Sequence, residues 1–254
     1  MVLCGKKQKN FGCNYIATGH YAKTEFSKKY NYWVIKKSRA GKKDQTYVLW
    51  NISKDLIEHL LFPLADFNDK EEIRKIAKEN NLKVANKPDS EDICFIPDGD
   101  YKEFLKTNSN IKSKKGNIVL SNGEILGKHN GLISYTIGQR KGLGISYKEP
   151  LYVISLNEEK NELVVGTENE LYSSNLYANE VNFLIDYDKW QDEIYAKIRY
   201  SSEMSKVKVK KQGDTIEVIF EKPQRAITKG QSVVFYDKEG ILLRRRKNNL
   251  VKII

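Results

Sequence analysis

The 254-residue chain has little cysteine, little proline and no long apolar run. Its three cysteines, Cys4, Cys13 and Cys94, form no CxxC pair, which excludes a disulfide framework and a zinc–cysteine cluster. No segment reaches the roughly 18 consecutive apolar residues of a membrane helix, and the first residues lack the features of a signal peptide. We therefore expect a cytoplasmic chain with no membrane contact and no protein-bound metal, in which any role for a cysteine is that of a thiol.

Glycine is present, but not in the arrangements that define the common nucleotide-binding loops. The chain has no Gly-Gly pair and no G-x-x-x-x-G-K-[ST] loop, and Tyr147 stands where the third glycine of a G-x-G-x-x-G fingerprint would fall. The stretch GLISYTIGQRKGLGI (131–145) instead puts glycines around the adjacent cations Arg140 and Lys141. A turn of this composition can present backbone N–H groups and positive charge to a phosphate.

The formal charge of +11 is unevenly distributed along the chain. Residues 1–60 carry +8, residues 61–190 carry −4 and residues 191–254 carry +7. If the fold brings the two basic ends together, they form a surface for nucleic acid. The alternative is a general preference for lysine, which accounts for 36 of the 44 basic residues, although such a bias would not leave the middle acidic.

The first hundred residues predict a mixed α/β fold. A helix is expected over NDKEEIRKIAKENN, with Asn68 as candidate N-cap and Glu71 three positions later, and another from Ser53 up to Pro63. The run YNYWVIKKS indicates a strand. After residue 101, glycine-containing turns separate short runs such as GLISYTI and PLYVISL, and from about residue 179 the runs KVKVKK, TIEVIFEK and QSVVFYD alternate as in a sandwich or barrel. The sequence thus predicts an α/β part, a β-rich middle and a C-terminal β-barrel.

Two short motifs in the α/β part could contact a ligand. In ATGHYA (17–22), Gly19 follows a strand-like run at the sheet edge where open α/β folds bind ligands, although a turn glycine followed by a surface histidine is the commoner interpretation. In KKDQTYVLW (42–50), a cation, an acceptor and an amide in a row could grip a phosphate and a base edge. A polar loop that enters a buried segment is the alternative.

Cys94 lies among carboxylates in SEDICFIPDGDY (90–101). Strand alternation would turn Cys94 away from Ile93 and Phe95, which would pack inward. Acidic neighbours raise the pKa of a thiol and so oppose a reactive thiolate. The residues alone therefore favour a buried structural cysteine here, and Cys13, just ahead of a strand, is also expected in the core.

Six stretches in this order resemble the tRNA-specific 2-thiouridylases: ATGHYA, KDQTY, SEDICFIPDGDYKEFL, GLISYTIGQRKGLG, PLYVI and GQSVVFYD. The resemblance implies the C-terminal part of an ATP-pyrophosphatase (adenine nucleotide alpha hydrolase-like) α/β domain over residues 1–101. It implies a small β-rich central domain over 102–178 and a C-terminal, tRNA-contacting β-barrel over 179–254. It also implies ATP-dependent transfer of persulfide sulfur to C2 of the wobble uridine (U34), with Mg²⁺ accompanying ATP.

The same resemblance implies roles for individual residues. Cys94 matches the cysteine that carries the persulfide, which reverses the interpretation from the residues alone, and Gly19 matches a residue of the ATP site. The tRNA anticodon loop would be contacted by His20, Lys43, Asp44, Gln45, Arg199, Tyr200 and Gln231. A sulfur-relay protein would supply the persulfide.

The chain departs from the family pattern at its start. The family's Ser-Gly-Gly phosphate loop and its second catalytic cysteine are expected upstream of Met1, so the resemblance is to an N-terminally truncated member. Two hypotheses follow from this: a 2-thiouridylase, whose activity as this fragment has to be tested, or a non-catalytic tRNA-binding protein that keeps the barrel and the basic termini.

Overall fold

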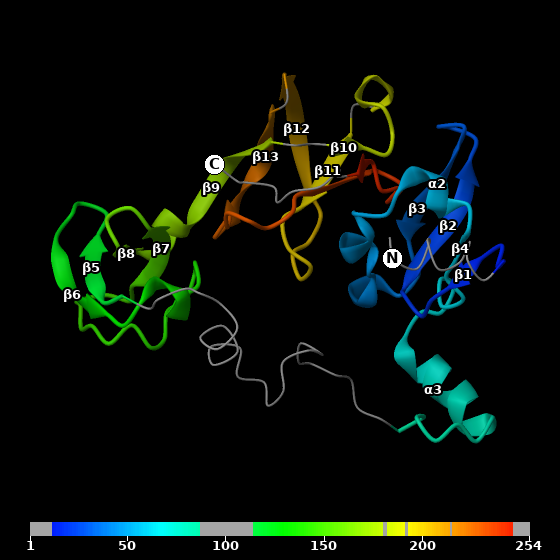
Figure 1. Cartoon of the computed structure of the whole chain (residues 1–254), viewed down its shortest axis with the longest axis horizontal. Helices are drawn as coiled ribbons and strands as arrows, with labels where there is room; N and C mark the ends of the chain where they lie inside the picture. Colours follow the sequence, from blue (N-terminus) through cyan, green and yellow to red (C-terminus); the bar gives the residue numbers. More distant parts are fainter. Residues whose placement is uncertain (1–11, 87–113, 180–181, 191–192, 214, 246–254) are drawn as a thin grey trace. The chain divides into compact units, whose positions relative to one another are not determined.

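A computed structural model describes residues 12–86, 114–179, 182–190, 193–213 and 215–245 (Figure 1). It divides into two compact units. Unit 1 comprises residues 1–86, 175–222 and 229–254, and unit 2 comprises residues 87–174 and 223–228. None of the described helices is long and apolar enough to cross a membrane.

The N-terminal part of unit 1 is mixed α/β, as predicted. A parallel pair joins β1 (Ile16–Ala17) to β4 (Leu60–Leu61), and a hairpin joins β2 (Ala22–Ser27) to β3 (Tyr32–Lys37). The helical elements are η1 (Gly41–Lys43), η2 (Thr46–Leu49), α2 (Lys54–Ile57) and α3 (Lys70–Glu79). The hairpin turn is closed by Asn31 in the left-handed region (φ 56°), a conformation that asparagine tolerates better than most residues.

The predicted helix at residues 68–81 is confirmed as α3, which ends at Glu79 with Asn80 as its C-cap. Its N-cap is Asp69 rather than Asn68. The Asp69 carboxylate accepts the backbone N–H groups of Glu71 and Glu72 at 2.8 and 3.1 Å, which satisfies two of the donors that a helix start leaves open. Asn68 instead donates its side-chain amide to Glu72 at 3.1 Å.

The helix predicted from Ser53 to Pro63 is wrong in its second half. Only the four residues of α2 are helical, and Leu60–Leu61 form strand β4. The backbone of β1 explains the change, because the N–H of Ile16 donates to the carbonyl of His59 at 2.8 Å and the N–H of Thr18 donates to that of Leu61 at 3.1 Å. Pairing with a distant strand therefore overrides local helix propensity in this segment.

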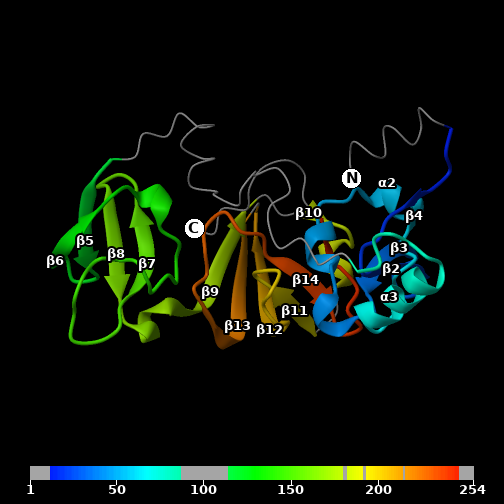
Figure 2. The same cartoon turned by 90° about the horizontal axis from the view of Figure 1, so that it is seen from below.

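The C-terminal part of unit 1 is a five-stranded sheet in the order β14-β11-β12-β13-β9, and Figure 2 shows the five strands side by side. Its strands are β9 (Tyr172–Asn179), β11 (Ile194–Lys197), β12 (Ser205–Gln212), β13 (Thr215–Arg225) and β14 (Val234–Asp237). A separate pair joins β10 (Asn182–Phe183) to β15 (Arg244–Arg245). The runs KVKVKK, TIEVIFEK and QSVVFYD are thus confirmed as strands.

The predicted closed β-barrel is not formed by the described strands. The outer edge of β14 is occupied by the segment that follows it, since the N–H of Leu243 donates to the carbonyl of Phe235 at 2.9 Å. That segment continues to the N-terminal hairpin, where the N–H of Leu242 donates to the carbonyl of Ile35 at 2.8 Å. Hydrogen bonding at the edge of β14 therefore continues to β3. A closed barrel would instead require β14 to pair with β9.

The two parts of unit 1 share one hydrophobic core. Its fully buried members include Ile35, Ile52 and Ile57 from the N-terminal part and Tyr236 and Leu242 from the C-terminal part. Two segments far apart in the sequence thus remove apolar surface from water together, at roughly 25 cal/mol per Å² of apolar area.

Asp237 adds a polar connection between the same two parts. Its carboxylate is 1% exposed and accepts the Lys29 ammonium and the Tyr30 hydroxyl, both at 2.9 Å. Its other oxygen accepts the N–H groups of Glu239 and Ile241, also at 2.9 Å.

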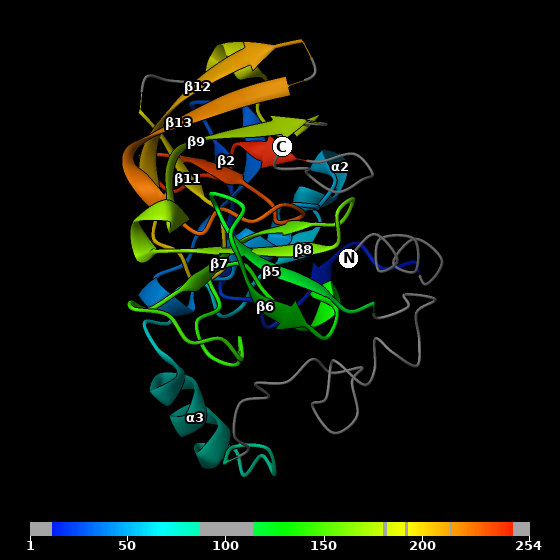
Figure 3. The same cartoon turned by 90° about the vertical axis from the view of Figure 1, so that its left-hand side faces the viewer.

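Unit 2 contains a four-stranded sheet in the order β6-β5-β8-β7 (Figure 3). Its strands are β5 (Gly116–Leu120), β6 (Ile125–His129), β7 (Tyr152–Asn157) and β8 (Glu162–Gly166), with the short helix η5 (Glu168–Leu171) following. The run PLYVISL is confirmed as a strand. The run GLISYTI is not a strand, because its start forms the 3-10 turn η4 (Leu132–Ser134).

Candidate functional site

The loop 38–47 folds around the carboxylate of Asp44. This side chain is 4% exposed. One oxygen accepts the N–H of Ser38 at 3.0 Å, and the other accepts the N–H of Thr46 at 3.2 Å and the Thr46 hydroxyl. A carboxylate is an acceptor-only group, so three donors suit it and close the loop tightly.

The next residues of the motif attach this loop to its surroundings. Gln45 and Tyr21 exchange two hydrogen bonds: the N–H of Tyr21 donates to the Gln45 side chain at 2.9 Å, and the N–H of Gln45 donates to the Tyr21 carbonyl at 2.8 Å. The Tyr47 hydroxyl donates to the carbonyls of Ser232 at 2.9 Å and Ile198 at 3.3 Å. The loop therefore joins the neighbour of His20 to the C-terminal sheet.

A third contact lies deeper in unit 1. The hydroxyl groups of Thr46 and Tyr236 are hydrogen-bonded at 3.2 Å, with Tyr236 as the donor because Thr46 gives its proton to Asp44. Burial raises the pKa of Tyr236, so this phenol stays protonated at any physiological pH.

The end of β11 and the segment after it supply cations and an aromatic ring beside the loop. The Arg199 guanidinium donates to the Gln231 side chain at 3.3 Å, and the Lys197 ammonium lies 5.8 Å from the centre of the Tyr200 ring. Burial lowers the pKa of Lys197, while the charge of Asp44 opposes this shift. Burial raises the pKa of Tyr200, and Asp44 adds to the shift. Asp44 is thus electrostatically coupled to both side chains.

Together these contacts define the 43–47/197–200/231 site. It unites three segments that are far apart in the sequence, and it contains six of the predicted tRNA contacts: Lys43, Asp44, Gln45, Arg199, Tyr200 and Gln231. Lys43 and Tyr200 are exposed, Tyr200 by 44%. An exposed cation can bind phosphate, and an exposed ring with the partly buried Lys197 and Arg199 near it in the chain can stack with an unpaired base.

His20 and Gly19 lie at the end of β1. The Thr18 hydroxyl and the His20 Nδ1 are 2.9 Å apart, and the imidazole packs edge-on against Phe62. Burial lowers the pKa of His20, so the ring is neutral at pH 7. At Gly19, an added Cβ would meet only the Leu64 side chain at 3.7 Å, so a ligand can approach the backbone closely. Among the described residues, the open space at Gly19 is the one observation that fits a bound ATP.

The cysteine predictions have different outcomes. Cys94 lies outside the described residues, as does Cys4. Cys13 is exposed, so its predicted place in the core is wrong. The reason is local, because β1 begins only at Ile16 and Cys13 lies in the irregular segment before it. Within the described ranges, no three His, Cys, Asp or Glu side chains are grouped to hold a metal ion; the absence of a protein-bound metal stays a prediction.

Comparison with known proteins was made over the whole chain. The family profile described as tRNA methyl transferase HUP domain matches residues 1–98, that described as tRNA methyl transferase PRC-barrel domain matches 102–167, and that described as Aminomethyltransferase beta-barrel domain matches 173–243. The protein named tRNA-specific 2-thiouridylase MnmA in Clostridioides difficile is 47% identical over 239 residues, or 93% of this chain. Proteins of the same name in Acetivibrio thermocellus and Carboxydothermus hydrogenoformans are 46% and 43% identical over 93% of the chain. The chain belongs to the tRNA-specific 2-thiouridylase family.

The chain spans about 66% of the length of these 2-thiouridylase relatives. The three successive profiles show a three-domain layout. The structure adds that the first and third of these segments pack on one core in unit 1.

Several residues that build the 43–47/197–200/231 site were not predicted from the sequence. Tyr47 was expected only as the entry to a buried segment, and Thr46, Lys197 and Tyr236 were not singled out. The adjacency of Tyr47 to KDQ was a usable signal. Lys197, two residues before Arg199, could have been found only from the strand that carries it.

Proposed function

We propose that this chain acts in ATP-dependent transfer of persulfide sulfur to C2 of the wobble uridine of tRNA, as a tRNA-uridine 2-sulfurtransferase. Family membership supports the proposal, and the single structural observation that supports it best is the 43–47/197–200/231 site. The proposed domains are residues 1–101, 102–178 and 179–254, with the first related to ATP-pyrophosphatases and the third a tRNA-contacting β domain.

In this proposal the side chains of the site divide into two groups. Lys43, Arg199 and Tyr200 contact the anticodon loop directly, since cations bind phosphates and the ring stacks on a base that has left the helix. Asp44 and Gln45 act through the loop, because their side chains accept hydrogen bonds from the backbone of Ser38, Thr46 and Tyr21. A negative carboxylate would repel the RNA backbone, which agrees with its burial.

The chemical step needs an activated oxygen and a sulfur donor. ATP, with Mg²⁺, supplies the activation that turns O2 of uridine into a leaving group. Gly19 lies where the backbone could border such a site, and His20, with its neutral ring, is the neighbouring residue proposed to contact tRNA. We propose Cys94 as the carrier of the persulfide, which a sulfur-relay protein delivers, and the location remains predicted to be cytoplasmic.

Binding is tested first, with unmodified tRNA and its isolated anticodon stem-loop. Arg199→Ala should weaken affinity and lower the slope of log K against log salt by roughly 0.7–0.9, the value for one phosphate. Arg74→Ala on α3 is the control and should change neither. Tyr200→Ala should cost about 1–3 kcal/mol of stacking that Tyr200→Phe retains. Equal effects of Arg199→Ala and Arg74→Ala would refute the assignment of this site.

Catalysis is tested separately, by mass spectrometry of nucleosides after incubation with tRNA, ATP, Mg²⁺ and a persulfide donor. Cys94→Ser should abolish 2-thiouridine while Cys13→Ser, an exposed cysteine, leaves it unchanged. If the wild-type chain binds tRNA yet makes no 2-thiouridine, and Cys94→Ser leaves binding unaffected, the chain is the non-catalytic tRNA-binding protein of the alternative hypothesis.

A further inference from the structure

The loop 140–151 of unit 2 has two faces of opposite character. Leu143, Ile145 and Tyr147 pack against the unit 2 core, of which Leu143 is a buried member. The positions between and after them, Gly142, Gly144, Ser146 and Lys148, are all exposed. From Gly142 to Ser146 the outer face therefore carries almost no side chain. The exposed stretch of backbone from 142 to 148 is at most about 20 Å long.

Most backbone N–H groups of this loop make no hydrogen bond within the described part of the chain. Apart from the hydrogen-bonded turn at residues 141–142, no hydrogen bond within the described part of the chain uses a backbone N–H of residues 140–149. Gly142 and Gly144 have φ of 78° and 70°, so the N–H directions do not repeat as in a strand. Gln139 fixes the start of the loop, because its side chain accepts the N–H of Thr136 at 3.0 Å and donates to the carbonyl of Lys141 at 2.9 Å.

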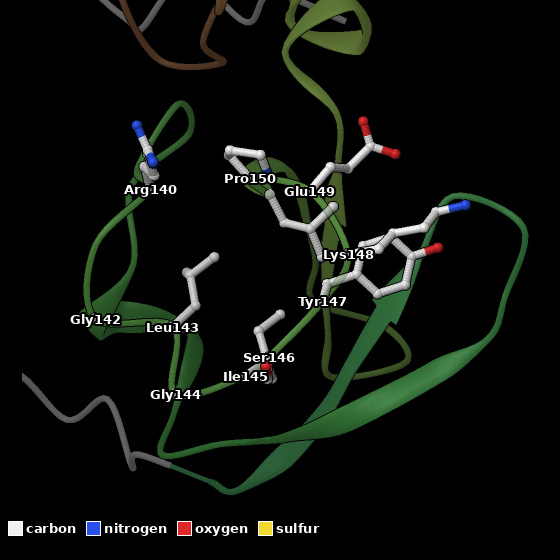
Figure 4. Close-up of a pocket in the computed structure, with 11 residues that line it drawn as sticks. Arg140, Gly142, Leu143, Gly144, Ile145, Ser146, Tyr147, Lys148, Glu149 and Pro150 are labelled. Atoms are coloured by element: carbon white, nitrogen blue, oxygen red, sulfur yellow. The ribbon is translucent and has the colours of Figure 1, made fainter.

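A pocket of about 440 Å³ lies within the loop (Figure 4). Figure 4 shows Arg140 on one side and Tyr147, Lys148 and Glu149 on the other, with Leu143 and Ile145 between them. The segment 140–151 contains three cations, Arg140, Lys141 and Lys148, against one carboxylate, Glu149. An apolar floor between cations, next to open N–H groups, fits a ligand with a flat apolar part and a negative charge.

We infer that this pocket is a second RNA-binding site, in which a nucleotide of tRNA places its phosphate on the 142–148 backbone between Arg140 and Lys148 and its base over Leu143 and Ile145. The inference rests on the proposed function. An acidic protein segment is the less favoured ligand. Added as a strand, it would need regularly alternating N–H and C=O groups, which the left-handed glycines interrupt.

The test measures tRNA affinity of the full chain at several salt concentrations. The double variant Arg140→Ala/Lys148→Ala should bind more weakly, with a salt slope lower by roughly 0.7–0.9 for the one phosphate held between them. The matched control Lys128→Ala/Lys160→Ala removes two cations of unit 2 outside the pocket and should bind as the wild type does. The charge-preserving variant Arg140→Lys/Lys148→Arg should retain the wild-type slope. Circular dichroism checks that each variant is folded.

The outcomes separate this inference from the function on which it rests. If the wild-type chain binds no tRNA, the proposed function and the second site fail together. If the wild type binds and Arg199→Ala lowers the slope, but Arg140→Ala/Lys148→Ala does not, only the second site is refuted. Unchanged tRNA binding with slower sulfur delivery from a donor protein would also refute it, and would assign the pocket to that protein.

Discussion

The replacement of Asp44 by asparagine tests whether this residue contacts RNA or holds the loop. An asparagine keeps the shape but offers one carbonyl oxygen and one amide group in place of two acceptors. In either orientation the amide faces a donor: the N–H of Ser38 or the N–H and hydroxyl of Thr46. Two donors then face each other in a buried place, where each unsatisfied group costs about 1–3 kcal/mol.

The expected loss for Asp44→Asn is therefore about 3 kcal/mol of the unfolding free energy of unit 1. The electrostatic effect has the same sign. Without the negative charge, the pKa of the half-buried Lys197 falls further, because the attraction that opposes its burial is gone. The 43–47/197–200/231 site should thus lose both its shape and part of its charge.

Tryptophan fluorescence measures this change in denaturant, since the three tryptophans, Trp33, Trp50 and Trp190, all belong to unit 1. Asp66→Asn is the control, because its carboxylate is exposed and pairs with Lys23 at 3.5 Å; the loss there should stay below about 1 kcal/mol. If Asp44→Asn costs no more than Asp66→Asn while tRNA affinity falls, the loop-holding role is refuted and direct contact is favoured.

Three further predictions concern unit 1. Because burial lowers the pKa of His20 below its usual 6.5, the unfolded chain binds this proton more tightly, so the unfolding free energy should fall as the pH is lowered through 6.5; urea titrations of His20→Gln should show a smaller fall. Tyr47→Phe should cost about 1–2 kcal/mol in the same fluorescence assay through its lost bonds to two carbonyls, while Tyr177→Phe, with an exposed hydroxyl, should cost less than 0.5. Asp237→Ala should lower the unfolding free energy by about 3 kcal/mol, because the Lys29 ammonium and the Tyr30 hydroxyl lose their acceptor; an unchanged midpoint would contradict this.

Local patterns in the sequence were sufficient wherever neighbouring residues decide the structure. The helix α3 follows from its apolar stripe and its polar start, and β12 and β13 follow from the alternation of polar and apolar residues over 206–210 and 215–218. The same local signals were misleading at Leu60–Leu61, where the partner strand β1 lies more than forty residues upstream. Propensity contains no information on such a partner.

The candidate site shows the same limit at the level of side chains. The sequence could propose that Asp44 and Arg199 act in one place, but only through resemblance to a family. It could not predict that the Asp44 carboxylate accepts hydrogen bonds from its own loop. The positions of the donors Ser38 and Thr46 around this carboxylate depend on the path of the backbone. Residue type therefore suggested a contact with RNA, whereas burial favours a positioning role.

The connection between the two parts of unit 1 has a consequence for how the site is assembled. Tyr47 reaches the carbonyls of Ile198 and Ser232, and Asp237 binds the Lys29 ammonium of the hairpin turn. These contacts, with the shared core, mean that the loop 38–47 cannot take up its position unless the C-terminal sheet is folded against it. Residues assigned to separate domains by sequence then form one cooperative structure, and a chain that ended before β14 would lose the geometry of Asp44 as well as Gln231.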